Sequence, residues 1–433
     1  MPGKRSLEWS RLDNAAKIFP STSSKTDTNV FRFYCELKSP IDSAVLQNAV
    51  NTAIKDFPNF LCVMKKGAFW YYLEQCDIEP VVIEESKTIC SPIYEDKKKL
   101  LLEISYYKNR INLEIYHALS DGTGAMQLLK TIVYHYIKIL HKAEFGDDLP
   151  LLDNDASFAQ KSSDSFRKYY QKIKNTPKTK SSKSYKLKMK KRDADHLQVI
   201  EGIASVKNVL EVAHKYNTTL TIYLTAVYMD AIHKEMSLQN ERRPVVLNIP
   251  VNLRKIFPSE TTKNFFGMIG VEYNYSKKTG DFADMIATID RSFKEELQKD
   301  RLSARMNKLS ALEHNPFIRI APLPLKNIAL RWGRRIADSK VTAVISNVGK
   351  VDMPQEMASY IDMFGVLAST LRLQLCISSF GDRLQMGFTS SFVSTDIQKN
   401  FFRMLTENGI DVEIRSNDFD ISAGEMKKDA SMS

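Results

Sequence analysis

The sequence predicts an α/β protein with mixed sheets and flanking helices, arranged as two similar domains. Its 433 residues, at roughly 150 residues per domain, correspond to two or three domains. Short strand-like and helix-like patterns alternate on both sides of one break in composition. Hydrophobic residues make up 43% of the chain and charged residues 26%, which is typical of a globular protein and excludes a disordered or fibrous one.

The break in composition sets the domain organisation. An N-terminal lobe is expected over 1–145, a crossover linker over 146–195 and a C-terminal lobe over 196–410. The linker is first acidic and then rich in Ser and Lys, which is typical of a solvated connection. The acidic, polar tail over 411–433 is expected to be disordered beyond Asn417.

Periodicity in the N-terminal lobe predicts strands and helices in alternation. Apolar runs predict strands, spacing of three and four predicts helices, and Asp42 is an expected helix cap. The expected elements are a strand at Val30–Leu37, a helix at Asp42–Ile54, a meander at Phe60–Met64, Phe69–Leu73 and Val81–Ile83, a hairpin at Leu101–Tyr107 and Ile111–Tyr116, and a helix over Met126–Leu140.

The C-terminal lobe shows the same mixture. Strands are predicted at Val245–Val251, Val341–Asn347, Leu371–Ile377 and Leu384–Phe388, and helices at Ser205–Tyr216, Thr219–Glu235, Asp281–Lys299, Ser303–His314, Leu325–Ile336 and Thr395–Leu405. The segment Phe317–Arg335 is basic and amphipathic enough for a membrane surface, but a core helix with its apolar face buried is the favoured interpretation.

Charge and cysteine usage restrict the class of partner. The net charge of +11 comes mainly from Lys172–Arg192, where ten basic residues occur without an acidic one. Aromatic residues do not interleave with this run apart from Tyr185, so no nucleic-acid partner is expected. Five cysteines without a CxxC pair favour a reducing compartment without disulfides or a metal site. No apolar stretch is long enough to span a membrane, so we expect a cytoplasmic protein without integral membrane association.

The segment YHALSDGTGA, Tyr116–Ala125, carries the best candidate for chemistry because it joins a strand to a helix. Strand parity places His117 on the buried face with Ile115, where a satisfied core histidine is the ordinary interpretation. Asp121 offers a nearby charge and Gly122 permits a sharp turn.

Other chemistries fit this segment poorly. A metal site lacks a second histidine, Ser120 does not lie in a GxSxG elbow, and Gln127 stands where a dinucleotide fingerprint needs its third glycine.

His117–Gly122, HALSDG, resembles the HxxxDG motif of the condensation-type and alcohol acyltransferase superfamily. Four further stretches resemble that superfamily in the right order: Thr219–Glu235, Leu247–Arg254, Asn264–Gly270 and the SNxG segment within Val344–Pro354. The resemblance implies two chloramphenicol acetyltransferase-like lobes with an active-site tunnel between them.

The resemblance also implies roles for the site residues. His117 would be the general base for attack of an acceptor on an acyl thioester. Asp121 would be structural and would pair with an arginine, for which Arg254 is the candidate by strand parity with Asn248 and Asn252.

The activity implied is that of a free-standing O-acyltransferase, most like an alcohol acetyltransferase. It would need no cofactor or metal and would take acyl-CoA as co-substrate and a small alcohol or amine as acceptor. An acyl carrier protein is the alternative donor, and a non-catalytic binding protein of the same fold is the alternative function. We expect a monomer.

Two departures from the superfamily pattern bear on subclass. Tyr116 stands where many relatives carry a second histidine, which is compatible with alcohol acyltransferases. The DFGWG segment of plant acyltransferases has no match, and Ser378–Leu384, SSFGDRL, is at best a remnant. Plant-type acyl transfer and peptide condensation are therefore disfavoured.

Overall fold

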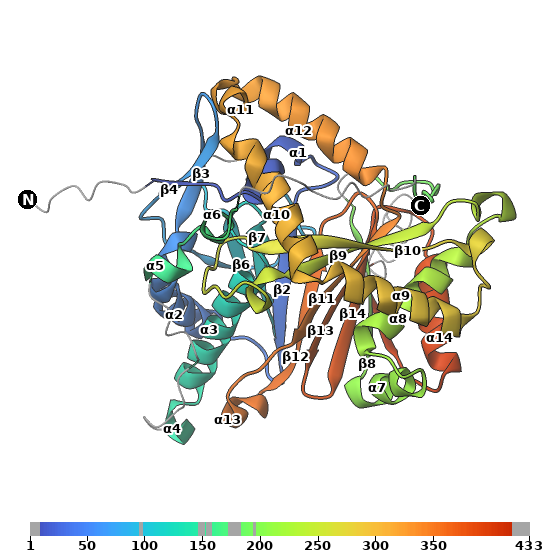
Figure 1. The fold of residues 1–433 in the computed structure, drawn as a ribbon. Helices are drawn as coiled ribbons and strands as arrows, with labels where there is room; N and C mark the ends of the chain where they lie inside the picture. The colour runs from blue at the N-terminus through green and yellow to red at the C-terminus, as the bar shows by residue number, and fades with distance from the viewer. Residues whose placement is uncertain are drawn as a thin grey trace, which may run out of the picture.

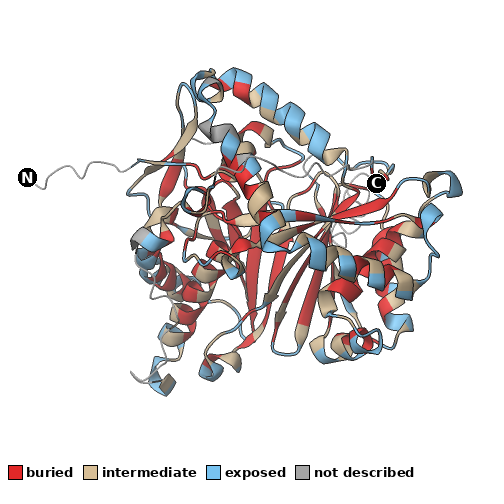
Figure 2. Cartoon of the chain, viewed as in Figure 1, coloured by how far each residue is buried: buried red, intermediate tan, exposed pale blue. Residues whose placement is uncertain are grey.

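The computed structural model describes residues 9–94, 98–145, 152, 158–171, 183–193 and 196–417, and its strands form three sheets (Figure 1). Two of these sheets lie side by side at the centre, with helices on their outer faces. Figure 2 shows the buried residues concentrated along the central strands and on the inner faces of those helices. The predicted α/β class with mixed sheets is confirmed.

The five-stranded sheet has the order β12-β2-β7-β6-β5 and forms the core of the N-terminal lobe. Its strands are β2 (Val30–Leu37), β5 (Val82–Glu84), β6 (Leu102–Tyr107), β7 (Arg110–Tyr116) and β12 (Ile361–Ala368). The helices α2 (Ser43–Ala53) and α3 (Gly122–Leu140) pack against each other, and α3 covers β2 and β7. Asp42 caps α2 as predicted, because its carboxylate accepts the N–H groups of Ala44 and Val45.

The seven-stranded sheet has the order β10-β9-β11-β13-β14-β8-β15. Its strands are β8 (Gln198–Ser205), β9 (Val245–Asn252), β10 (Phe266–Tyr273), β11 (Ala343–Lys350), β13 (Leu373–Phe380), β14 (Arg383–Ser390) and β15 (Glu413–Ser416). Helix α8 (Leu220–His233) is buried along most of its length and packs against α9 (Phe282–Glu296) and α14 (Asp396–Glu407). Ser205 caps α7 (Val206–Lys215), and Thr219 caps α8.

The remaining elements are short or peripheral. The third sheet has the order β1-β4-β3, from β1 (Trp9–Arg11), β4 (Tyr71–Gln75) and β3 (Cys62–Lys66). The other α-helices are α1 (Phe19–Thr22), α4 (Lys142–Phe145), α5 (Phe158–Lys161), α6 (Ser165–Lys168), α10 (Lys299–His314), α11 (Pro316–Ile320), α12 (Leu323–Asp338) and α13 (Gln355–Ala358). The 3₁₀ helices are η1 (Ala16–Ile18), η2 (Ile54–Asp56), η3 (Pro58–Phe60), η4 (Leu238–Asn240), η5 (Leu253–Lys255) and η6 (Tyr275–Lys277).

The predicted meander in the N-terminal lobe is wrong. Strands β3 and β4 pair with each other in the three-stranded sheet. Strand β5 instead belongs to the five-stranded sheet, where it runs parallel to β6. A parallel neighbour requires a crossover connection, so local periodicity could show the strands but not their partners. Periodicity also failed to predict β8, β10 and β12 as strands.

Strand β12 comes from the expected C-terminal lobe but pairs with β2 of the N-terminal lobe. Tyr34 on β2 lies against Gly365, where a Cβ atom would approach the tyrosine ring to 2.0 Å. The Tyr34 hydroxyl then donates to Glu201 on β8, which joins the two large sheets. The lobes therefore share a strand and a buried polar contact.

Helix α12 is not the core helix that the sequence favoured. It lies on the outside of the molecule at the top of Figure 1, and most of its surface is exposed in Figure 2. Leu323 and Lys326 are its buried residues, while Trp332 and its apolar neighbours face outward. The amphipathic pattern predicted the helix correctly, but it did not predict that the polar side packs on the protein and the apolar side is exposed.

The predicted basic linker lies partly outside the described residues, as do residues 418–433 of the predicted tail. The part over 183–193 packs on the C-terminal lobe, where the backbone N–H of Tyr185 donates to the carbonyl of Pro244. Lys186 Nζ donates to the carbonyl oxygens of Asp338 and Val341, and burial lowers the pKa of Lys186 to about 8. At least this lysine is structural. Among the described residues, no helix combines the length and apolar content needed to cross a bilayer.

Candidate active site

His117 lies directly after β7, where residues of both lobes meet around its imidazole. Its backbone N–H donates to the carbonyl of Asn29 at 2.9 Å, which continues the sheet beyond Tyr116. Three aromatic rings surround the half-buried imidazole: Phe19 stacks on it with centroids 4.5 Å apart, and Phe31 and Phe266 lie at 4.9 and 5.4 Å. The ring is therefore held in an apolar setting at the seam between the lobes.

Asn264 orients the imidazole. His117 Nδ1 lies 3.0 Å from Asn264 Oδ1, while Asn264 Nδ2 donates to the His117 carbonyl oxygen at 3.0 Å and to Asp13 Oδ2 at 3.1 Å. Because both partners of the amide nitrogen are acceptors, the amide oxygen must be the atom that faces His117. An amide oxygen only accepts, so Nδ1 carries the proton and Nε2 carries the lone pair in the neutral ring.

Asp13 fixes Asn264 from the opposite side. Its Oδ2 accepts from both the side-chain and the backbone nitrogen of Asn264, and its Oδ1 accepts from Ala16 N at 2.7 Å. Burial raises the pKa of Asp13 to about 7, against the opposing effect of these N–H donors. No sequence pattern marks Asp13, and Asn264 stands out only as the first residue of the stretch Asn264–Gly270.

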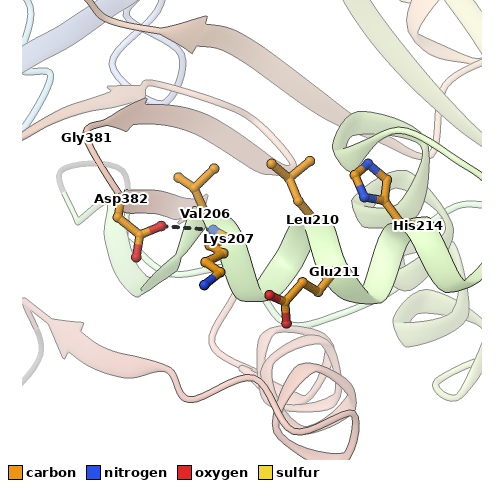
Figure 3. Close-up of a pocket in the computed structure, with 7 residues that line it drawn as sticks. All are labelled: Val206, Lys207, Leu210, Glu211, His214, Gly381 and Asp382. Carbon is orange, nitrogen blue, oxygen red and sulfur yellow. Dashed lines mark hydrogen bonds between the residues drawn. The ribbon is translucent and has the colours of Figure 1, made fainter.

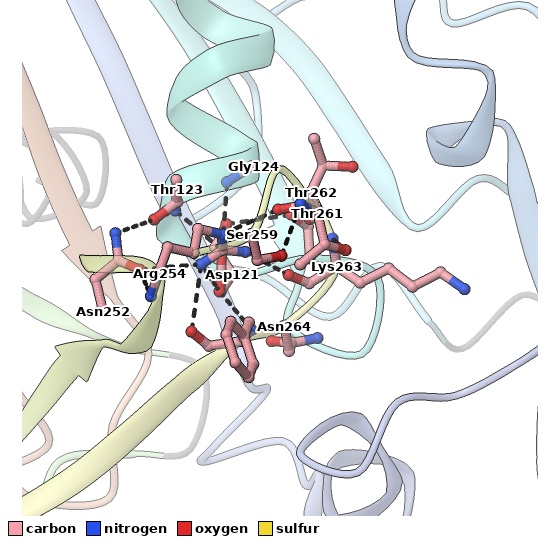
Figure 4. A network of polar contacts seen from close by, with 12 residues as sticks. Asp121, Thr123, Gly124, Asn252, Arg254, Ser259, Thr261, Thr262, Lys263 and Asn264 are labelled. Carbon is pink, nitrogen blue, oxygen red and sulfur yellow. Dashed lines mark hydrogen bonds and ion pairs between the residues drawn. The ribbon is translucent and has the colours of Figure 1, made fainter. Parts of the chain in front are cut away.

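Asp121 joins the motif loop to the C-terminal lobe (Figure 4). Its Oδ1 caps α3 by accepting the N–H groups of Thr123 and Gly124. Its carboxylate pairs with Arg254 through Nη1–Oδ2 at 2.8 Å and Nη2–Oδ1 at 3.2 Å. Both side chains are at least nine-tenths buried, and Oδ2 also accepts the backbone N–H of Phe265 at 2.8 Å.

Arg254 organises the loop over 261–265 that carries Asn264. Its guanidinium donates to the carbonyl oxygen of Thr261 at 3.0 Å and to that of Lys263 at 2.6 Å. These are the residues before and after Thr262. Arg254 thus holds Lys263, the residue before Asn264, and Asp121 holds Phe265, the residue after it. The ion pair therefore fixes the loop on both sides of the residue that contacts His117. The pair therefore positions the imidazole through Asn264.

The structural context of two predicted residues differs from expectation. Arg254 lies in η5, after β9 ends at Asn252, so strand parity does not explain its direction. Gly122 begins α3 without a positive φ, so no sharp turn requires glycine there. The glycine that the packing requires is Gly124, because a Cβ atom there would lie 2.3 Å from the Thr262 carbonyl oxygen.

The setting of His117 favours the neutral imidazole. Burial lowers the pKa of His117 below its ordinary value of 6.5, and the charge of Asp121 opposes that shift only in part. A neutral ring at neutral pH is the form that a general base needs.

We expect activity to fall on the acidic side with a midpoint below pH 6.5. The lowered folded-state pKa means that His117 contributes stability above pH 6.5 and that this contribution is lost as pH falls through the folded value. Asp13 acts in the opposite sense, because its raised pKa contributes stability below pH 3.8 that is lost as pH rises to about 7. Imidazole NMR titration of His117 itself, beside the pH–rate profile, separates the two groups. An imidazole midpoint above 6.5 would contradict the expectation.

The two departures from the family pattern have structural roles here. Tyr116, in place of a second histidine, is buried with its hydroxyl 3.0 Å from Ser23 Oγ. Within the DFGWG-like remnant, Asp382 accepts the N–H of Lys207 at 2.9 Å and lines a pocket at the start of α7 (Figure 3). That pocket does not include His117, and the tunnel implied by the resemblance stays a prediction.

The described residues contain no group of three or more His, Cys, Asp or Glu side chains placed to hold a metal ion. The neutral imidazole of His117 can accept and return a proton. The arrangement of a half-buried imidazole, an orienting amide and a bracing ion pair suits acid–base catalysis.

The fold is shared with solved structures. Trichothecene 15-O-acetyltransferase TRI3 from Fusarium sporotrichioides is 10% identical with a TM-score of 0.59, over 92% of this chain and 94% of that one. Polyketide synthase associated protein 5 from Mycobacterium tuberculosis is 13% identical with a TM-score of 0.58, over 92% and 96%. A mutant starter condensation domain of rhizomide synthetase RzmA, in complex with C8-CoA, is 13% identical with a TM-score of 0.60, over 92% and 94%.

These likenesses extend over nearly the full length of each chain, so this chain shares the fold of these acetyltransferase, polyketide-synthase-associated and condensation-domain structures. No protein-family model matches the sequence, and no curated protein matches it.

Proposed function

We propose that the protein is an acyl-CoA-dependent O-acyltransferase in which His117 is the general base. The observation that carries this proposal is the contact of His117 Nδ1 with Asn264, which leaves the lone pair on Nε2 within an HxxxDG loop. The superfamily fold supports the same class of reaction.

In the proposed reaction, Nε2 of His117 removes the proton of the acceptor hydroxyl as its oxygen attacks the thioester carbonyl carbon. A C–O bond forms, the tetrahedral intermediate collapses, and the C–S bond breaks. The imidazolium then returns the proton to the thiolate, so the ring ends neutral and free thiol and ester are the products. The Nδ1–H···Oδ1 contact persists through both charge states, because Nδ1 is a donor in each.

The apolar surroundings of His117 favour an apolar acceptor or acyl group, which would keep water away from the imidazole. The rings of Phe19, Phe31 and Phe266 line the imidazole, and water at this position would hydrolyse the thioester. A CoA thioester is the proposed donor, since a neighbour of this fold is known in complex with C8-CoA. A carrier-bound thioester is the second candidate, favoured by the condensation-domain neighbours.

The test is thiol release from acetyl-CoA and octanoyl-CoA, followed with a thiol reagent against a panel of alcohols and amines. Acceptor-dependent release that disappears in His117→Gln would support the proposal. Release without an acceptor dependence would indicate thioester hydrolysis. Transfer from an acylated carrier protein but not from either CoA thioester would overturn the CoA assignment and retain the transferase.

Asn264→Ala should lower kcat by about tenfold to a hundredfold without unfolding the protein, because a positioning hydrogen bond is lost but the base remains. The ¹⁵N NMR signals of the His117 ring should change from Nδ1–H alone to a mixture of tautomers. Asn408→Ala is the matched control, since its amide bonds only the end of α14. An unchanged tautomer in Asn264→Ala would contradict the orienting role.

A further inference from the structure

Helix α12 carries an exposed stripe of large apolar side chains, called here the apolar stripe: Leu325, Ile328, Trp332 and Ile336. These four residues are spaced by three or four, so they project from one face of the helix. Each is between 53% and 62% exposed. Ile320, just before the helix, is also exposed and extends the apolar surface. Isolated exposed apolar residues are ordinary, but an unbroken row along three turns is not.

The opposite face of α12 packs on the protein and fixes the orientation of the stripe. Asn327 accepts from the Ser21 hydroxyl at 2.7 Å, Arg331 Nε donates to the Ser21 carbonyl, and Arg334 pairs with Asp27 at 3.1 Å. Lys326 is buried and lies 3.7 Å from the centroid of the Trp70 ring. The helix is thus anchored by its polar side and presents its apolar side outward, which is the reverse of an ordinary surface helix.

Basic residues flank the apolar stripe. Arg335 lies along one side of it and is exposed, and Lys340 is exposed just beyond the helix. The acidic residue of α12, Asp338, is already bound to Arg334. Apolar and aromatic side chains beside arginines match the interface of an anionic bilayer, where rings enter the acyl boundary and guanidinium groups meet phosphates.

The position of α12 relative to His117 adds a second argument. Helix α12 packs on α1, and Phe19 of α1 stacks on the His117 ring. The apolar stripe therefore lies over the segment that covers the candidate active site. A molecule held at a membrane by α12 would have that site close to the lipid surface.

We propose that the apolar stripe docks the protein peripherally on an anionic membrane surface. The helix lies in the plane of the interface, with Trp332 and Ile328 inserted and Arg335 at headgroup level. This proposal does not depend on the acyl-transfer chemistry, because the exposed surface of α12 carries it whether or not His117 is a base.

Sedimentation with phosphatidylcholine vesicles, with and without phosphatidylserine, tests the proposal. The wild-type protein should bind the phosphatidylserine-containing vesicles and lose affinity as salt rises. The double variant Ile328→Glu/Trp332→Glu should bind at least about a hundredfold more weakly, because two apolar side chains are lost from the interface. Arg335→Glu should weaken binding to the anionic vesicles by about tenfold.

Two matched variants control for the introduced charges. Leu238→Glu places a glutamate at another exposed apolar position, and Arg403→Glu reverses an exposed charge on α14. Both should bind vesicles like the wild type. Thermal unfolding checks that the α12 variants remain folded.

Equal vesicle binding by Ile328→Glu/Trp332→Glu and wild type would overturn the proposal. Absence of wild-type binding to anionic vesicles would also overturn it. A dimer in sedimentation velocity that the double variant abolishes, without vesicle binding, would assign the stripe to a second copy of the chain. Vesicle binding by a protein that shows no acyl transfer would leave this proposal standing and count only against the proposed activity.

Discussion

His117→Gln should lower kcat/KM for acyl transfer by about a hundredfold to ten-thousandfold, the usual contribution of a general base. Glutamine is close to histidine in length and its amide N–H can still donate to Asn264 Oδ1, so the local structure should be kept. It has no group that accepts a proton at neutral pH. The measurement is acceptor-dependent thiol release over a range of acceptor concentrations.

The control for this variant is His214→Gln, which changes an exposed histidine on α7. It should leave both kcat/KM and the unfolding transition unchanged. Thermal unfolding of His117→Gln should remain cooperative, with at most a modest decrease from lost ring contacts. Full activity in His117→Gln would exclude His117 as the base, whatever the fold suggests.

Arg254→Met should lower the free energy of unfolding by about 3–5 kcal/mol, because it leaves the buried Asp121 carboxylate without its cation. Replacing both partners, as Asp121→Asn/Arg254→Met, should recover part of that loss, since no buried charge then remains unpaired. Acyl transfer should fall in both variants because the loop carrying Asn264 loses its brace. Urea unfolding measures the free energy of unfolding of each variant.

The control for the ion pair is Lys294→Met, which breaks the exposed pair with Asp290 on α9. An exposed pair of this kind contributes only up to about 1 kcal/mol. If Arg254→Met cost no more than Lys294→Met, the bracing role of the Asp121–Arg254 pair would be refuted. Arg254→Lys should lie between the two, because lysine keeps the charge but cannot make the two-pronged contact.

Local sequence predicted what depends on local interactions. The strand Val30–Leu37 and the helix capped by Asp42 have the expected bounds to within a residue or two. The helices predicted from Ser205 and Thr219 are also confirmed, and the structure shows these two residues as their caps. A cap and an apolar period act within a few residues, so one segment contains the whole signal.

Local periodicity and caps could not predict which distant strands pair with each other. Strand β12 joins a sheet whose other members lie more than 240 residues earlier, and β5 runs parallel to β6 through a crossover. Both facts depend on where the chain returns in space. The likeness of HALSDG to a known motif predicted the fold that the solved structures share, because such a motif carries information from related chains and periodicity does not.

The sequence by itself determined the α/β class, the main helices and the candidate base, His117, with Asp121 beside it. Only the tertiary structure decided what surrounds that base. Asp13 and Asn264 are 251 residues apart and meet beside the imidazole. No sequence signal marks Asp13, and Asn264 stands out only as the first residue of a family-like stretch. The tertiary structure also decided which face of α12 is exposed. An amphipathic helix has an apolar and a polar side in any sequence, but which side packs depends on the partners that the rest of the fold provides.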